Sequence, residues 1–334
     1  MIASSNDCDS PLRGITYSSE QRFLPVESGH HEFIGKPLEI RAVCWRPTQP
    51  RASILLVQGR AGFLEKYLPV VARLLRRNLE VVSFDWRGQG GSSRLIDNSQ
   101  AGYVPGFDDY LDDLQAVISA DLFSTPARFI LAHSMGGHLV LRWLAERHPD
   151  GETFRQVWLT ATLADLVTDP YPRWFARAVS YLACRCGFAK RYVFGGGRYD
   201  PEAFRDASLS ELTSDVEEVE RQRHCLQQHP ELQLGSPSFA WLQAAFRSIV
   251  VLNRSDGIAR IRVPVTQFVA GADQVVDNRA IYALDARLTN GTVVSIPGAL
   301  HELLLESDVI NQPLWSLLWE QLEQELSKGA SEPH

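Results

Sequence analysis

The chain has 334 residues, of which 45% are hydrophobic and 22% charged, a composition typical of a globular protein that can bury a large core. Its 33 basic and 40 acidic side chains give a formal net charge of −7 without any basic tract, which argues against nucleic acid as a partner. No apolar run approaches the ~20 residues that span a bilayer, and the N-terminal residues lack the order of a signal peptide.

The cysteines form no metal-ligand spacing, and their odd number, five, favours a reducing compartment. Cys184 and Cys186 lie in an apolar segment, so we expect two buried thiols there rather than a redox pair. We therefore expect a cytoplasmic protein that needs neither a metal nor another cofactor.

The first part of the chain alternates between predicted strands and helices. Residues 1–33 show little periodicity and are expected to form a leader, whereas residues 38–45 alternate apolar and polar side chains, as an antiparallel strand does. Buried apolar runs and helical patterns then follow in the order strand 53–57, helix 67–77, strand 80–85, helix 109–120, strand 129–133 and strand 156–161. This order predicts an α/β fold with a mostly parallel central sheet flanked by helices.

The alternation stops after residue 162, where helical patterns broken by proline and glycine replace it. Strands are predicted again at 263–270 and 292–296, followed by an amphipathic helix at 312–328. We therefore predict a helical cap inserted into the core. The expected division is a leader (1–33), a first core part (34–162), the cap (163–250), a second core part (251–328) and a tail (329–334).

The stretch Ala132-His133-Ser134-Met135-Gly136 joins a predicted strand to a predicted helix. A serine on such a tight turn is a nucleophile elbow, in which the residues two before and two after the serine must be small. Ala132 and Gly136 meet that requirement. The alternative is a serine that merely caps the helix.

A serine hydroxyl becomes a nucleophile when a base accepts its proton and a carboxylate orients that base. Asp273 and His301 follow Ser134 in that order, each just beyond the end of a predicted strand. Asp277 is the alternative acid. His133 lies too close to the serine in sequence to act as its base, as does His138, and both are expected to have packing or hydrogen-bonding roles.

Acyl transfer also requires N–H donors for the oxyanion of its intermediate. The backbone N–H of Met135 is one expected donor, and that of Arg60, on the loop after strand 53–57, is the other. Gly59 would let that backbone approach closely. The side chain of Arg60 is then free for an anionic head group or for a structural salt bridge.

These segments together resemble the bacterial lysophospholipase L2 and monoacylglycerol lipase group of serine hydrolases, in the α/β-hydrolase superfamily. The matching segments are Gln58-Gly59-Arg60, Asp85-Trp86-Arg87-Gly88-Gln89-Gly90, Ala132 to Gly137, Gly271-Ala272-Asp273 and His301-Glu302. The resemblance covers roughly residues 40–306. It implies an α/β-hydrolase fold with a helical cap, a triad of Ser134, Asp273 and His301, and an oxyanion hole from the amides of Arg60 and Met135. The sequence departs from the family pattern at Ala132, where glycine is usual, and at Gln58, where histidine or proline is common.

The resemblance implies hydrolysis of a carboxylic ester of a single-chain lipid, a lysophospholipid or a monoacylglycerol, through an acyl-enzyme on Ser134. A small-molecule carboxylesterase or amidase is one alternative, and a non-catalytic ligand-binding homologue is another. Residues 171–182 mix aromatic, aliphatic and arginine side chains, which suits an acyl tunnel, a transient contact with the inner membrane, or a cap helix packed on the core. The expected substrate contacts are Gly59, Trp174, Phe175 and Trp241. The oligomeric state stays open.

Overall fold

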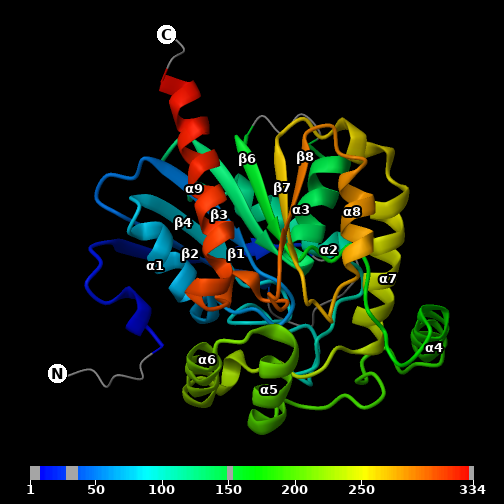
Figure 1. The fold of residues 1–334 in the computed structure, drawn as a ribbon. Helices are drawn as coiled ribbons and strands as arrows, with labels where there is room; N and C mark the ends of the chain where they lie inside the picture. Colours follow the sequence, from blue (N-terminus) through cyan, green and yellow to red (C-terminus); the bar gives the residue numbers. More distant parts are fainter. Residues whose placement is uncertain (1–7, 28–36, 149–152, 331–334) are drawn as a thin grey trace.

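An eight-stranded sheet runs through the centre of the computed structural model, which describes residues 8–27, 37–148 and 153–330 (Figure 1). The strand order is β1-β2-β4-β3-β5-β6-β7-β8. β2 pairs antiparallel with β1 and β4, and the other neighbouring strands are parallel. The strands are Ser18–Val26 (β1), Leu38–Arg46 (β2), Ala52–Val57 (β3), Leu79–Phe84 (β4), Arg128–His133 (β5), Gln156–Thr160 (β6), Val265–Ala270 (β7) and Gly291–Ile296 (β8).

Helices cover both faces of this sheet, which confirms the predicted fold class. Figure 1 shows α1 (Leu68–Leu75) and α9 (Asp308–Ala330) on one face, and α2 (Asp108–Ser119) and α3 (Met135–Glu146) on the other. β3, β4, β6 and β7 are buried along their whole length, because parallel strands with helices on both sides have no face toward water. α8 (Asn278–Asp285) lies between β7 and β8 in the chain.

The edge strand β1 occupies residues that we expected to belong to a leader. Each residue of β1 pairs with β2, from Ser18 opposite Arg46 to Val26 opposite Leu38. Most β1 side chains are exposed, so the strand lacks the apolar alternation that would predict it. The strand is stabilised by its main-chain hydrogen bonds to β2. Residues 1–7 and 28–33 of the expected leader, and residues 331–334 of the expected tail, lie outside the described residues.

The chain between β6 and β7 forms the helices α4 (Arg173–Arg185), α5 (Pro201–Ala207), α6 (Val216–Gln228) and α7 (Phe239–Arg254). Figure 1 shows α5 and α6 below the carboxyl ends of the parallel strands. Hydrogen bonds from several segments attach this cap to the core, two of them next to His301. The backbone N–H of Glu302 donates to Leu212 at 2.7 Å, and the Thr213 hydroxyl donates to the Leu305 carbonyl at 2.9 Å.

Helix α7 differs from the rest of the cap because its buried side joins the main hydrophobic core. Trp241, Ala245 and Leu252 belong to that core cluster, and the helix continues to Arg254. The expected end of the cap at residue 250 therefore falls inside a helix that packs on the core. No helix among the described residues has the length and apolarity needed to cross a membrane.

The cysteines differ from the sequence-based expectation in two ways. Cys8 and Cys225 form a disulfide, with their Cα atoms 5.3 Å apart, whereas an odd cysteine count had favoured a reducing compartment. The count was a poor guide because pairing depends on which cysteines the fold brings together, and here an N-terminal segment packs against α6. Cys184 is half-buried and Cys186 is exposed, so they are not the two buried thiols that we expected.

Candidate active site

Ser134 lies on the turn between β5 and α3 with φ 52° and ψ −117°, a backbone conformation that is strained for a residue with a side chain. The turn is tight because a side-chain carbon on Gly136 would lie 2.5 Å from the carbonyl oxygen of Gln58 and 2.7 Å from that of Val57. Ala132 is fully buried at the other small position, where its single methyl group is accommodated. The local sequence therefore produces the predicted elbow.

His301 connects the serine to a carboxylate. Its Nε2 lies 2.9 Å from Ser134 Oγ, and its Nδ1 lies 2.8 Å from Asp273 Oδ2. Ser134 makes no side-chain hydrogen bond that caps α3, which excludes the simple capping role. The structure thus brings Ser134, His301 and Asp273 into one chain of hydrogen bonds at the carboxyl end of the parallel sheet, where α/β folds place their ligand crevices.

Asp273 is held by its own loop as well as by His301. Its Oδ1 accepts the backbone N–H groups of Val275 at 2.8 Å and Val276 at 3.1 Å. Burial raises the pKa of Asp273, but the hydrogen bond and charge of His301 and these two N–H groups outweigh burial and leave the pKa below its ordinary value. The carboxylate is therefore ionised at neutral pH and suited to stabilise an imidazolium on His301.

The alternative acid, Asp277, is engaged elsewhere. Its carboxylate accepts the backbone N–H of Arg279 at 3.0 Å, which caps α8, and it lies 3.4 Å from the guanidinium of Arg173. The structure therefore places Asp273, and not Asp277, against His301.

The two histidines beside the elbow have hydrogen-bonding roles, as we expected. His133 Nδ1 lies 3.1 Å from the Thr160 hydroxyl, and its Nε2 lies 3.3 Å from the Glu302 carboxylate. His138 Nε2 lies 2.6 Å from the Ser248 hydroxyl. Burial lowers the pKa of His138 to about 3, so this imidazole is neutral.

A buried ion pair beside His301 was missed by the sequence reasoning. Lys66 Nζ lies 2.5 Å from Glu302 Oε1, and the Tyr67 hydroxyl donates to Glu302 Oε2 at 3.2 Å. Burial raises the pKa of Glu302. The hydrogen bond and electrostatic interaction with His133 and the positive charge of Lys66 outweigh burial, and they hold that pKa well below its ordinary value. The residues are 236 positions apart, so no local pattern predicts the pair.

The expected oxyanion donors border the same cavity as Ser134. Met135 opens α3, where the first N–H groups have no acceptor inside the helix. Arg60 follows Gly59 on the loop after β3, and a side-chain carbon on Gly59 would lie 3.2 Å from Ser134 Cβ. Gly59 thus permits a close backbone approach and does not itself line the cavity. Gln58 is buried, and its amide donates to the Phe84 carbonyl at 2.7 Å, so its side chain has a structural role.

The cavity above Ser134 has a volume of about 620 Å³. Its walls are mainly apolar side chains from the cap and from the loops that follow β6 and β7. These include Leu163, Leu166, Phe204, Leu212, Leu226, Leu232, Leu234, Trp241, Leu242 and Val275. Trp241 therefore lies where we expected a substrate contact.

Trp174 and Phe175 do not line this cavity, and the expectation that they contact the substrate is wrong for the structure described. Trp174 is 70% exposed and Phe175 is 41% exposed. Both lie on α4, in which only Ser180 is buried. Helix α4 packs against α7 at the side of the molecule (Figure 1). Its aromatic residues Trp174 and Phe175 are exposed there instead of lining the site.

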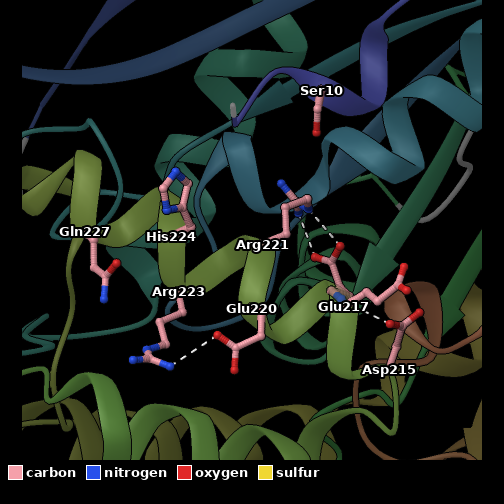
Figure 2. Close-up of a pocket in the computed structure, with 9 residues that line it drawn as sticks. Ser10, Asp215, Glu217, Glu220, Arg221, Arg223, His224 and Gln227 are labelled. Carbon is pink, nitrogen blue, oxygen red and sulfur yellow. Dashed lines mark hydrogen bonds and ion pairs between the residues drawn. The ribbon is translucent and has the colours of Figure 1, made fainter. Parts of the chain in front are cut away.

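A second hollow, of about 650 Å³, lies along α6 and is lined by polar side chains. Figure 2 shows Arg223 directed toward Glu220, at 3.2 Å, and Arg221 pairs with Glu218 at 2.6 Å. Ser134, Asp273 and His301 are not among its lining residues. Its charges are largely paired with one another, so this hollow does not compete with the cavity at Ser134 as the reactive site.

Comparisons with known proteins agree with this arrangement. Residues 48–308 match the model of the Hydrolase_4 family, described as serine aminopeptidase, S33. The probable lysophospholipase L2 of Haemophilus influenzae is 28% identical over 266 residues, which cover 78% of this chain and 80% of that protein. Lysophospholipase L2 of Escherichia coli K12 is 28% identical over 292 residues, or 84% of this chain and 83% of that protein.

Two solved structures share the fold. A soluble variant of monoglyceride lipase from Saccharomyces cerevisiae has a TM-score of 0.65 and 18% identity, covering 90% of this chain and 96% of that chain. Monoacylglycerol lipase from Paleococcus ferrophilus has a TM-score of 0.63 and 18% identity, covering 87% of this chain and 98% of that chain.

Proposed function

We propose that this chain, which belongs to the Hydrolase_4 (serine aminopeptidase, S33) family of α/β-hydrolases, cleaves a carboxylic ester of a single-chain lipid. The observation that carries the proposal is the Ser134–His301–Asp273 chain of hydrogen bonds at the floor of a cavity with apolar walls. The lysophospholipase L2 relatives support a lysophospholipid as the substrate, and a monoacylglycerol is the neutral single-chain alternative.

The proposed reaction passes through an acyl-enzyme. Ser134 Oγ attacks the ester carbonyl carbon while His301 Nε2 accepts the hydroxyl proton, and Asp273 holds the resulting imidazolium. The backbone N–H groups of Met135 and Arg60 stabilise the oxyanion. The alcohol then leaves with the proton from His301, and a water activated by the same imidazole releases the fatty acid.

The apolar walls favour a long acyl chain over a short one. Each methylene transferred from water to such surroundings gains ~0.8 kcal/mol, so several buried methylenes raise binding by orders of magnitude. A small-molecule esterase would gain little from walls formed by Leu226, Leu232 and Leu242.

We expect kcat/KM for a palmitoyl lysophospholipid or monopalmitoylglycerol to exceed that for a nitrophenyl acetate by at least about tenfold after correction for intrinsic ester reactivity. The measurement is release of fatty acid or nitrophenol by purified protein, with substrates below their aggregation concentrations. A protein that turns over only the short ester is a general esterase. A protein that reacts with no ester and leaves a fluorophosphonate probe unbound is the non-catalytic homologue.

We also propose that α4 and the segment after it rest on a membrane surface. Residues 170–199 contain six basic residues and no acidic one. Large apolar side chains protrude among these cations, with Trp174 70% exposed and Phe194 81% exposed. An apolar face surrounded by basic side chains is typical of segments that lie in the interface of an anionic bilayer. The cytoplasmic location itself stays a prediction.

Replacing Trp174 and Phe194 together by serine is expected to weaken binding to phosphatidylglycerol vesicles roughly tenfold or more, because two large apolar side chains no longer enter the interface. Co-sedimentation measures the partition coefficient, which should also fall as salt is added. Val309→Ser is the matched control, since Val309 on α9 is 86% exposed but lies outside this segment. Equal losses in the double variant and the control would contradict the proposal.

A further inference from the structure

Arg60 is a charged side chain on an otherwise mostly apolar cavity, and its guanidinium is held in one place. Its Nη2 donates to the carbonyl oxygen of Gly235 at 2.6 Å, and its Cζ lies 5.4 Å from the ring centroid of Trp241. A side-chain carbon on Gly102 would lie 2.9 Å from Nη2, so the loop that holds Gly102 packs closely against the guanidinium. The arginine therefore keeps a fixed position beside the floor of the cavity.

This guanidinium has no carboxylate partner among the described residues, and its buried Nε has no hydrogen-bond partner there. The structural salt bridge that the sequence left open is therefore not formed within the described part of the chain. Burial lowers the pKa of Arg60 to about 10, which still leaves the side chain charged at neutral pH. A partly buried cation without a counter-ion is costly, and a bound anion would offset that cost.

A second arginine lies at the same cap segment. A side-chain carbon on Gly235 would lie 3.0 Å from Arg198 Cα, so the backbone of Arg198 packs on the residue whose carbonyl accepts from Arg60. The side chain of Arg198 is exposed and contributes to the cavity lining. Arg60 inside the cavity and Arg198 at its solvent side thus flank Gly235.

The acidic residues of the cavity lining do not neutralise this pair. Glu302 is paired with Lys66 at 2.5 Å, and Asp200 accepts the backbone N–H groups of Glu202 and Ala203 as the N-cap of α5. Glu211, the remaining acid, is exposed. Its backbone carbonyl accepts the backbone N–H of His301 at 3.3 Å.

We propose that Arg60, assisted by Arg198, binds the phosphate of a lysophospholipid head group while the ester lies at Ser134. Arg60 and Ser134 line the same cavity, and in the substrate a glycerol backbone separates the ester from the phosphate. The preferred substrate is then a single-chain ester that bears a phosphodiester, not a neutral monoacylglycerol. This inference rests on the proposed function and names the substrate class of the same site.

Binding is measured first, in a protein that cannot turn over. Ser134→Ala is titrated with palmitoyl lysophosphatidylglycerol and with monopalmitoylglycerol below aggregation, using the tryptophan fluorescence to which Trp241 contributes. We expect the lysophospholipid to bind more tightly than the monoacylglycerol. Arg60→Gln in the Ser134→Ala background should reduce the ratio of the two affinities about 10- to 100-fold, as loss of a charge-assisted phosphate contact does. Arg198→Gln should reduce it less. Arg279→Gln, which removes an exposed cation from α8, is the matched control.

In proteins with an intact Ser134, the ratio of kcat/KM for palmitoyl lysophosphatidylglycerol to kcat/KM for monopalmitoylglycerol is measured. An unchanged ratio in both Arg60→Gln and Arg198→Gln overturns the inference even if the wild type hydrolyses lipids. Conversely, lipid binding with the expected Arg60 dependence but without turnover supports the head-group site and contradicts the proposed hydrolysis.

Arg60→Lys keeps the charge but loses the planar donor set, so it should give an intermediate ratio, and it replaces Arg60→Gln if that variant fails to fold. Inorganic phosphate and glycerophosphoglycerol are compared as competitors of the lysophospholipid. Stronger competition by glycerophosphoglycerol is expected. Equal competition by phosphate alone would assign the site to free anions and overturn the head-group role.

Discussion

Replacing Ser134 by alanine is expected to lower ester turnover by roughly 10⁴–10⁶-fold while leaving the fold intact. The hydroxyl lies 2.9 Å from His301 Nε2, and no covalent intermediate can form without it. The oxyanion donors and the cavity remain, so a residual rate above that of water is expected. The methyl group of alanine occupies the position of Ser134 Cβ, so packing around the elbow should be preserved.

Initial rates of fatty-acid release and labelling by a fluorophosphonate test this result. The wild type should label at one site and the variant should not. Ser248→Ala is the control, because it removes a buried hydroxyl that contacts His138 instead of His301, and its activity should stay within about tenfold of the wild type. If Ser134→Ala retained wild-type turnover, the nucleophile would have to be another residue.

Replacing Asp273 by asparagine should lower kcat by roughly 10⁴-fold, whereas Asp277→Asn should change it by less than about threefold. An amide at position 273 cannot balance the imidazolium charge and favours the wrong tautomer of His301, whose Nδ1 now lies 2.8 Å from Asp273. Asp277 instead caps α8 and pairs with the partly exposed Arg173.

The pair is matched in chemistry and lies on one loop, so the comparison isolates the contact with His301. Steady-state kcat on the best ester measures the catalytic loss of each variant, and thermal unfolding shows whether each variant is folded. A larger loss for Asp277→Asn than for Asp273→Asn would show that the loop rearranges when substrate binds and that the two acids exchange roles.

The sequence was most informative where the chemistry imposes a local pattern. Ser134 is recognisable because a nucleophile elbow requires a strand, small neighbours and a helix within a few residues. Asp273 and His301 could be located because the family order and the ends of parallel strands restrict where the partners can lie. These signals do not depend on knowing how distant segments pack.

The sequence-based predictions were wrong or incomplete where the packing of distant segments determines the structure. Residues 171–182 carry aromatic side chains that suit either a cavity or an exposed surface, and only the packing of α4 against α7 shows that Trp174 and Phe175 face outward. Strand β1 is held by pairing with β2 rather than by an apolar face of its own. Lys66 and Glu302 meet across 236 positions, a separation at which a single sequence contains no detectable signal.

The disulfide between Cys8 and Cys225 makes a covalent ring of the intervening chain, because the two cysteines are 217 positions apart. Ser134 lies within this ring, whereas Asp273 and His301 lie on the segment that leaves it. A protease that cuts near the exposed Arg185, at the end of α4, would therefore open the ring without releasing a fragment. The nucleophile and its base would remain one covalent molecule after such a nick, and only reduction of the disulfide would free the two pieces to separate.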